Sequence, residues 1–343
     1  MRIFGLTKHS CMPHLRGMRK LPLAALALVA TLGGVTLGLA SCHPTSHATV
    51  TSELGEARAA AELERIVDEP GPVTVETVVG ADWEVPRSGL INLDHAKAHE
   101  AHLSDGPEPI VIALHAIRHP TRGLFLVDTG VERALRDAPE QAALSGLAAR
   151  AMGADKIRVR TDTASWIAAQ HEPVRGVLLT HLHLDHLTGM RDVPDAVPIY
   201  AGPGETSARA FLNAFVRAPT DAALAGKAPI REWRFASDPG GAFEGVVDVF
   251  GDGTVWAIHV PGHTPGSTAY LARTPGGPVL FTGDASHTAW GWEHGVEPGT
   301  YSADGPRSAD SFARLQAFVA RHPRIDVRLG HQSLPKAGAS AAR

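Results

Sequence analysis

The stretch Thr180–Gly189 reads THLHLDHLTG and holds four potential metal ligands within six consecutive residues. His181 and His183 are two residues apart at the end of an apolar run, so on a strand both side chains leave on the same side. Asp185 and His186 follow where the chain should turn into a loop. These ligand types at this spacing predict a metal site, because one rigid strand end can aim them at a common point.

Three further motifs place ligand types after other apolar runs. His263 lies in VPGHTPGS directly after TVWAIHV, Asp284 lies in LFTGDAS, and His331 lies in VRLGHQS. Each motif alone is weak, because a histidine or aspartate after a strand is more often a loop or capping residue. Together with the first cluster they form a set that can meet above one sheet edge.

The composition narrows the classes of function. A hydrophobic fraction of 44% and a charged fraction of 20% in 343 residues allow a substantial buried core. Lys+Arg 32 against Asp+Glu 36 leaves no basic surplus, so a nucleic-acid partner is not expected and a small-molecule substrate is. The 19 histidines favour metal chemistry.

The N-terminus has the pattern of an export signal. Arg19 and Lys20 precede an apolar run over residues 21–40, which ends in LASC at Leu39–Cys42. This ending resembles the lipobox of bacterial lipoproteins and predicts lipidation of Cys42. The alternatives are an ordinary signal peptide or an uncleaved anchor helix. Translation can start at Met1 or at Met18.

The predicted location is the outer membrane, where the lipid anchor would hold the protein on the side that faces the periplasm. His43 follows the lipidated cysteine, whereas an aspartate there would favour retention at the inner membrane.

The rest of the chain predicts one catalytic domain. Residues 1–42 are assigned to the signal, 43–72 to a tether with a short helix near 53–67, 73–335 to the domain and 336–343 to a tail. Strands are predicted over 73–79, 110–117, 123–130, 174–180, 197–202, 254–260, 267–272, 278–284 and 325–331. Helices are predicted over 131–152, 163–170 and 308–321. Strands in two halves, each closed by helices, predict an α/β fold of two packed sheets.

The ligand set resembles that of the metallo-β-lactamase superfamily, and the resemblance runs from about Val73 to His331. It implies an αββα four-layer sandwich with a dinuclear site at one edge. It assigns the first metal to His181, His183 and His263, the second to Asp185, His186 and His331, and the bridge to Asp284. It implies two Zn²⁺ as cofactors, although iron, manganese or cobalt could fill the same ligands. Asp128 in FLVDTG is interpreted as a residue that braces the following loop.

The implied chemistry is hydrolysis. Two metal ions about 3.5–4 Å apart share a water and lower its pKa towards neutrality, which generates a bridging hydroxide. Asp185 would orient this nucleophile and then hand a proton to the leaving group.

Within the superfamily the N-acyl-homoserine lactone lactonases are most similar, through VPGHTPGS and TGDAS. Two other branches of the superfamily match less well. The β-lactamases with a similar HxHxDH segment lack the bridging aspartate that this chain has, and glyoxalase II enzymes carry a helical extension after the last histidine. The expected reaction is therefore opening of a lactone or cleavage of a carboxylic ester. The lactonases usually have a tyrosine where this chain has His287, which can also donate a hydrogen bond to an oxyanion.

Several alternatives stay open. Trp290 and Trp292 form either a hydrophobic wall of the substrate pocket or a packed surface loop. His95, His99 and His102 share a helix face, either as a further metal site or as a solvated rim. An exported organophosphate or aryl-ester hydrolase and a non-catalytic metal-binding lipoprotein are the competing functions. The oligomeric state is not predicted.

The lipobox interpretation has a direct test. Cys42→Ala removes the only sulfur that could carry the lipid in LASC, so we expect the protein to leave the membrane fraction after cell lysis. The measurement is immunoblotting of soluble and membrane fractions. Unchanged membrane partitioning of Cys42→Ala would favour an uncleaved anchor helix.

Overall fold

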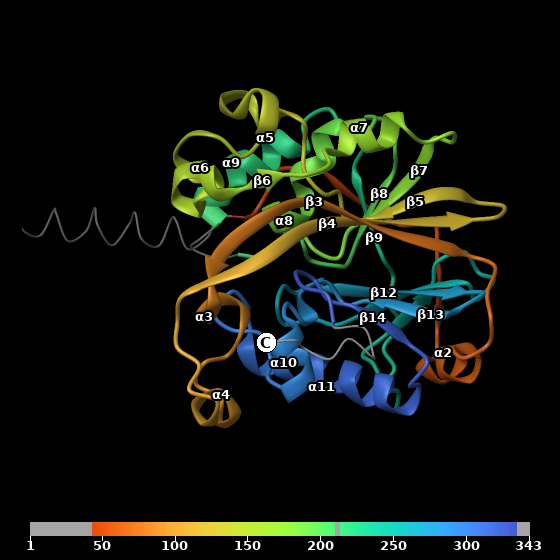
Figure 1. Cartoon of the computed structure of the whole chain (residues 1–343). Coiled ribbons are helices and arrows are strands. Elements are labelled where there is room, and N and C mark those ends of the chain that lie inside the picture. Colours follow the sequence, from red (N-terminus) through yellow and green to blue (C-terminus); the bar gives the residue numbers. More distant parts are fainter. Residues whose placement is uncertain (1–42, 210–212, 335–343) are drawn as a thin grey trace, which may run out of the picture.

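The computed structural model describes residues 43–209 and 213–334, which form two β-sheets packed face to face with helices on both outer faces (Figure 1). The predicted αββα sandwich is confirmed. The apolar run at 21–40, Cys42 and the tail at 336–343 lie outside the described residues. Within the described part, no helix is long and apolar enough to cross a bilayer.

The first sheet has eight strands in the order β1-β9-β8-β7-β5-β4-β3-β6. They are β1 Thr49–Thr51, β3 Thr74–Pro86, β4 Pro107–His119, β5 Gly123–Val127, β6 Arg158–Val159, β7 Val174–Leu178, β8 Ile199–Ala201 and β9 Ile230–Glu232. Strands β3, β4 and β5 pair antiparallel, whereas β5, β7, β8 and β9 run parallel. The parallel half is buried on both sides, which explains its continuous apolar sequences.

The second sheet has six strands in the order β14-β13-β12-β11-β10-β2. They are β2 Glu56–Arg58, β10 Val246–Asp248, β11 Val255–His259, β12 Thr268–Thr274, β13 Gly277–Phe281 and β14 Asp326–Arg328. Strands β13 and β14 are parallel, and the other pairs are antiparallel. The carboxyl ends of β13 and β14 therefore lie together at one edge.

Helices cover the outer face of each sheet. They are α2 Ala60–Ile66, α3 Arg87–Leu90, α4 Ala96–Glu100, α5 Ala134–Asp137, α6 Gly146–Met152, α7 Thr163–Ala168, α8 Leu184–Leu187, α9 Asn213–Ala223, α10 Ala289–His294 and α11 Gly305–Arg321. In Figure 1, α5, α6, α7 and α9 lie over the first sheet, and α2, α10 and α11 lie under the second.

The core between the sheets fixes the position of the strand that leads into the THLHLDH motif. Phe125, Leu178, Tyr270 and Phe281 pack there from both sheets. The buried Tyr270 hydroxyl donates to Leu179 O at 3.0 Å and accepts the indole N–H of Trp233 at 2.9 Å. These bonds connect the second sheet to the chain just before the first ligand. They therefore fix the position of the two sheets relative to each other at the site.

The prediction of a tether over residues 43–72 was wrong. Strand β1 pairs with β9 and extends the first sheet, while β2 pairs with β10 and extends the second. Helix α2 then buries Ala60 and Leu63 against the second sheet and α11. The small polar residues misled the interpretation, because edge strands bury few side chains and show no apolar alternation.

The prediction of one continuous helix over 131–152 was also wrong. The structure has the short helices α5 and α6, separated by a 3-10 turn at Pro139–Gln141. Pro139 has no N–H to donate to the preceding turn, and Gly146 adopts a left-handed φ of 62°. Both residues interrupt an otherwise Ala/Leu-rich stretch.

Leu63→Ala tests whether the segment before residue 73 belongs to the fold. Leu63 is fully buried, so we expect a loss of about 2–5 kcal/mol in the free energy of unfolding. Glu62→Ala, an exposed change on the same helix, should stay within about 0.5 kcal/mol of the parent. Denaturant titration measures both. Equal stabilities of the two variants would restore the tether interpretation.

Candidate metal centre

The seven predicted ligands lie in segments that follow strands β7, β11, β13 and β14. His181 and His183 lie in the loop after β7, and α8 carries Asp185 and His186. His263 lies in the turn after β11, Asp284 in the 3-10 turn Gly283–Ala285 after β13, and His331 just beyond β14. The strand ends of both sheets therefore converge on one point, as the sequence predicted.

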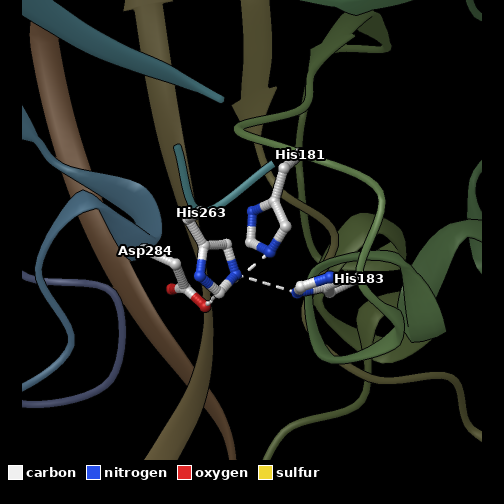
Figure 2. Close-up of side chains that lie close together, drawn as sticks. All are labelled: His181, His183, His263 and Asp284. Atoms are coloured by element: carbon white, nitrogen blue, oxygen red, sulfur yellow. Dashed lines mark hydrogen bonds and ion pairs between the residues drawn. The ribbon is translucent and has the colours of Figure 1, made fainter. Parts of the chain in front are cut away.

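The first cluster contains His181, His183, His263 and Asp284, whose ligand atoms all lie within 4.8 Å of one another (Figure 2). His263 Nε2 is 2.8 Å from His183 Nδ1 and 3.4 Å from Asp284 Oδ2. His181 Nε2 is 3.7 Å from the same Asp284 oxygen. Four atoms about 2.1 Å from a tetrahedral ion are separated by about 3.4 Å, so these spacings suit one ion.

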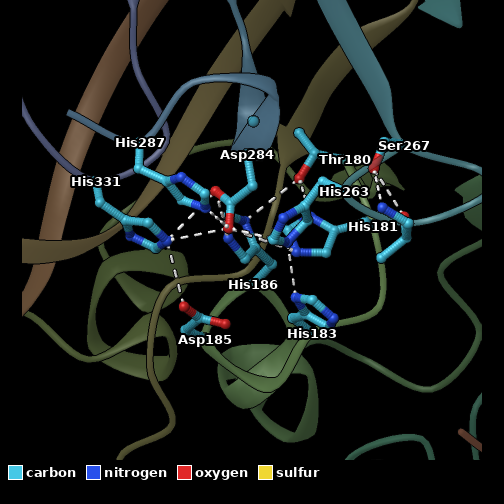
Figure 3. A network of polar contacts seen from close by, with 12 residues as sticks. Thr180, His181, His183, Asp185, His186, His263, Ser267, Asp284, His287 and His331 are labelled. Carbon is cyan, nitrogen blue, oxygen red and sulfur yellow. Dashed lines mark hydrogen bonds and ion pairs between the residues drawn. The ribbon is translucent and has the colours of Figure 1, made fainter. Parts of the chain in front are cut away.

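The second cluster contains Asp185, His186, Asp284 and His331 (Figure 3). Asp284 Oδ1 lies 3.2 Å from His186 Nε2 and 3.3 Å from His331 Nε2. His331 Nε2 is also 3.3 Å from Asp185 Oδ2. Asp284 therefore faces both clusters, which is the position that the resemblance assigned to a bridging ligand.

Unpartnered buried atoms support a cation at this position. Within the described residues, His181 Nε2, His186 Nε2, Asp284 Oδ1 and His287 Nε2 are all buried without a hydrogen bond: the three nitrogens lie 3.1–3.7 Å from the Asp284 carboxylate but outside hydrogen-bond geometry. An unsatisfied buried polar atom costs about 1–3 kcal/mol, so four at one place require a compensating ligand. Imidazole nitrogens and carboxylate oxygens are ligands that zinc and related divalent metals accept. The buried histidines and aspartates of this site therefore fit a divalent metal ion.

Hydrogen bonds on the far ring nitrogens fix which nitrogen faces the clusters. His331 Nδ1–H donates to Val111 O at 3.0 Å, and His186 Nδ1 lies 2.8 Å from Asp128 Oδ2. Asp128 has a φ of 56°, and its Oδ1 also accepts the backbone N–H of Thr180 at 2.8 Å. The bracing interpretation of Asp128 agrees with these contacts, which orient a ligand and hold the loop that carries the motif.

The charges of the cluster compensate one another. Burial holds the pKa values of His181 and His263 well below their ordinary value, so both rings are neutral with a free lone pair. Burial also lowers the pKa of His331, but the carboxylates of Asp284 and Asp185 outweigh it and raise that pKa to about 10. A metal ion competes for the same lone pair, so metal binding displaces this proton.

The two aspartates stay ionised in the same environment. Burial would raise the pKa values of Asp185 and Asp284, but a hydrogen bond from His331 to Asp185 and the charge of His331 beside Asp284, together with the His186 charge, hold both below their usual range. Two buried carboxylates that keep their charge form a strong site for cations.

His287 is buried inside the centre and is not a surface residue of the loop that leads to Trp290 and Trp292. Its Nδ1–H donates to Leu90 O at 3.1 Å, and its Nε2 lies 3.1 Å from Asp284 Oδ2 (Figure 3). The ring stacks parallel to His331 at 5.7 Å between centroids. The backbone therefore uses the Nδ1 proton, and only Nε2 can face a substrate oxygen.

Trp290 and Trp292 of α10 have packing partners. Trp290 stacks on His294 at 4.3 Å between centroids and packs against the core cluster beside β3. Trp292 packs edge-on against Phe312 of α11. The packed-loop alternative describes these contacts, and a role in the substrate pocket stays a prediction.

The three histidines of the predicted helix face do not form a third centre. His95 caps the short helix α4, and His102 lies beyond its end with a φ of 54°. Over residues 43–209 and 213–334, the only groups positioned to hold a metal are the two clusters above. The alternative of a solvated rim agrees with the exposure of His99 and His102.

Glu205 and Tyr301 also lie near the centre and were not predicted from the sequence. Glu205 is buried beside both histidine loops, and burial raises its pKa to about 7 against the hydrogen bonds that it accepts. Tyr301 is partly exposed, and burial and then the Asp185 carboxylate raise the pKa of its phenol. Neither residue belongs to a motif. Glu205 could have been noticed because it also follows a strand of the parallel half, β8.

Known proteins share this fold and part of the sequence. The sequence matches the Lactamase_B family, the metallo-beta-lactamase superfamily, over residues 114–313. The N-acyl homoserine lactonase AttM of Agrobacterium fabrum is 32% identical over 166 residues, which are 46% of this chain and 58% of that protein. The aligned part thus spans little more than half of this relative.

Two solved structures are similar in fold. An N-acyl homoserine lactone hydrolase with N-hexanoyl-L-homoserine at its catalytic metal centre matches with a TM-score of 0.51 at 19% identity, over 76% of this chain and 93% of that chain. The dizinc quorum-quenching lactonase AidC, in complex with a product, matches with a TM-score of 0.50 at 14% identity, over 84% and 93%. Because the family match covers more than half of the sequence and the two-sheet fold agrees with it, the chain belongs to the metallo-beta-lactamase superfamily.

Proposed function

We propose that the protein is a dinuclear metal-dependent hydrolase that opens lactones or cleaves carboxylic esters. The observation that carries the proposal is the single Asp284 carboxylate facing two histidine-rich clusters. Two divalent ions held there would activate water and polarise a carbonyl oxygen. The lactone assignment draws support from the AttM relative and from the two lactone-hydrolysing enzymes of the same fold.

Asp185 is suited to move the proton. Its side chain is 17% exposed, whereas those of Asp284 and His331 are 4% and 3% exposed. Oδ2 lies beside His331, which leaves the other oxygen for a water or substrate hydroxyl. Asp185 can accept the proton that the attacking water loses and deliver it to the oxygen of the breaking C–O bond. In a lactone that oxygen becomes the hydroxyl of the opened product.

His287 is the residue in which the chain departs from the lactonase pattern. Its Nε2 lies beside the bridging carboxylate and between the rings of His263 and His331. With Nδ1–H donated to Leu90 O, Nε2 can donate only when both ring nitrogens are protonated, and in that form Nε2–H would hold Asp284 or a substrate oxyanion in place. This departure favours one competing function, the hydrolysis of aryl or organophosphate esters, because these substrates present no lactone carbonyl for a tyrosine to bind.

Zinc is the proposed metal, with iron, manganese or cobalt as substitutes. Neutral imidazoles and carboxylates fit zinc, and AidC is a dizinc enzyme of the same fold. We also propose export and lipid anchoring at the outer membrane, on the strength of the basic residues, the apolar run at 21–40 and the LASC ending.

The metal content tests the dinuclear centre. Protein purified under metal-replete conditions should hold two ions per chain, and Asp284→Ala should hold fewer because both clusters lose a ligand. Elemental analysis by mass spectrometry measures the content. Asp252→Ala, which removes a partly exposed aspartate bonded to His119, is the control and should keep both ions. A parent protein with one ion or none would contradict the dinuclear reading.

The substrate class is tested by a hydrolysis screen of the zinc-loaded protein. We expect the highest kcat/KM on N-acyl homoserine lactones or simple lactones, and loss of turnover after chelation. Aryl esters, phosphotriesters and β-lactams are the comparison substrates. Preference for a phosphotriester would establish the competing function, and no turnover on any class would support a non-catalytic metal-binding protein.

His287→Ala separates chemistry from metal binding. Loss of one oxyanion donor typically lowers kcat by about 10²–10³, and we expect that loss with the metal content unchanged. His294→Ala, which changes an exposed histidine at the end of α10, should match the parent. Kinetics of His287→Ala equal to those of the parent would remove His287 from the mechanism.

A further inference from the structure

Glu205 is a buried carboxylate that joins the two loops of the first cluster. It is 2% exposed and lies in the turn after β8. Its Oε2 accepts the backbone N–H of Leu182 at 2.9 Å. Its Oε1 accepts the backbone N–H of Gly266 at 2.8 Å and the hydroxyl of Thr264.

These partners are the chain neighbours of metal ligands. Leu182 lies between His181 and His183, so the bond to its N–H holds the peptide that joins two ligands. Thr264 directly follows His263, so its hydroxyl holds the turn that carries the third histidine. One side chain thus spans two segments that are about eighty residues apart in the sequence and meet at the first cluster.

Two glycines allow the close approach that Glu205 needs. A Cβ on Gly202 would lie 1.7 Å from Gly266 O, and a Cβ on Gly266 would lie 2.7 Å from Gly202 C. The backbones of the Glu205 turn and the His263 turn therefore touch without any side chain between them. This close approach lets the Glu205 carboxylate contact both loops that carry the ligands.

We propose that Glu205 is a positioning residue of the first metal site, which holds the His181–His183 peptide and the His263 turn at the separation that one ion requires. Groups that orient metal ligands typically change metal affinity by about 10–100-fold when they are removed. The inference rests on the proposed function only in that the first cluster binds a metal.

The ionised carboxylate suits this role because every partner donates. Two N–H groups and one hydroxyl point at its oxygens, and a carboxylate accepts with both. In Glu205→Gln the amide NH₂ must face either Leu182 N–H or Gly266 N–H, so one loop loses its anchor. The second cluster has no hydrogen bond to Glu205, and its affinity should change less.

Glu232 offers a matched control. Its Oε1 accepts the backbone N–H of Gly204, in the same turn as Glu205, at 3.1 Å. Glu232→Gln keeps that acceptor and touches neither histidine loop through it. A general loosening of the turn would therefore affect both variants, whereas loss of the anchor affects Glu205→Gln alone.

The test is competition for zinc between the fully loaded protein and a chromophoric chelator at pH 8, which gives a dissociation constant for each ion. We expect Glu205→Gln to raise the dissociation constant of one of the two ions by tenfold or more. The constant of the other ion should stay within about threefold of the parent value. The absorption spectrum of the cobalt-substituted protein should change in the same variant, because the first site's geometry is distorted. Glu232→Gln should match the parent in both measurements.

Two results would overturn the proposal: both constants of Glu205→Gln equal to those of the parent, or both ions weakened equally. If Glu205→Gln does not fold, Thr264→Val removes one donor from the other side, and a selective weakening of several-fold is expected there. Parent-like constants for Thr264→Val would then count against it. A parent protein that binds two ions but hydrolyses nothing contradicts the proposed function and leaves this test valid.

Discussion

The bridging position of Asp284 is the constraint on which the rest of the structure depends. One buried carboxylate must show an oxygen to each of two histidine groups, and it keeps its charge because those groups surround it. Burial of an isolated ionised carboxylate is very costly, so this arrangement is stable only when cations or protonated imidazoles face it. The site and the fold are therefore linked through a single side chain.

The sandwich meets this constraint by bringing several strand ends together. Asp284 and His331 follow the parallel neighbours β13 and β14, while His181 follows β7 of the opposite sheet. Room for the carboxylate comes from glycine: a Cβ at Gly330 would lie 2.3 Å from Asp284 Oδ1. Gly283, with a φ of 50°, lets the chain turn directly after β13. A side chain at Gly330 would displace the bridge, and one at Gly283 would lie 2.7 Å from Thr180 Cβ.

The ligand set could be predicted from the sequence because each ligand follows an apolar run that forms a strand, and such runs are local patterns. Apolar runs marked the strands, and the residue after each run marked the edge where side chains meet. His181, His263 and Asp284 were found in this way, and the structure places their ligand atoms together. The two-sheet architecture followed from the same runs.

The remaining features depend on contacts between distant segments, which no local pattern reveals. The small residues near Thr49 and Glu56 pair as edge strands only because β9 and β10 present free edges. The direction of the His287 ring depends on Leu90 O, and Glu205 acquires its role from loops distant in the sequence. Hydrogen-bond partners brought in by tertiary structure decide such residues, and composition carries no signal for them.

Anomalous diffraction from crystals of the zinc-loaded protein tests the central claim most directly. Data on both sides of the zinc absorption edge locate each ion independently of any assumed ligand. We expect two peaks about 3.5–4 Å apart, one within bonding distance of His181, His183 and His263, and both beside Asp284. A single peak, or two peaks that do not share Asp284, would contradict it.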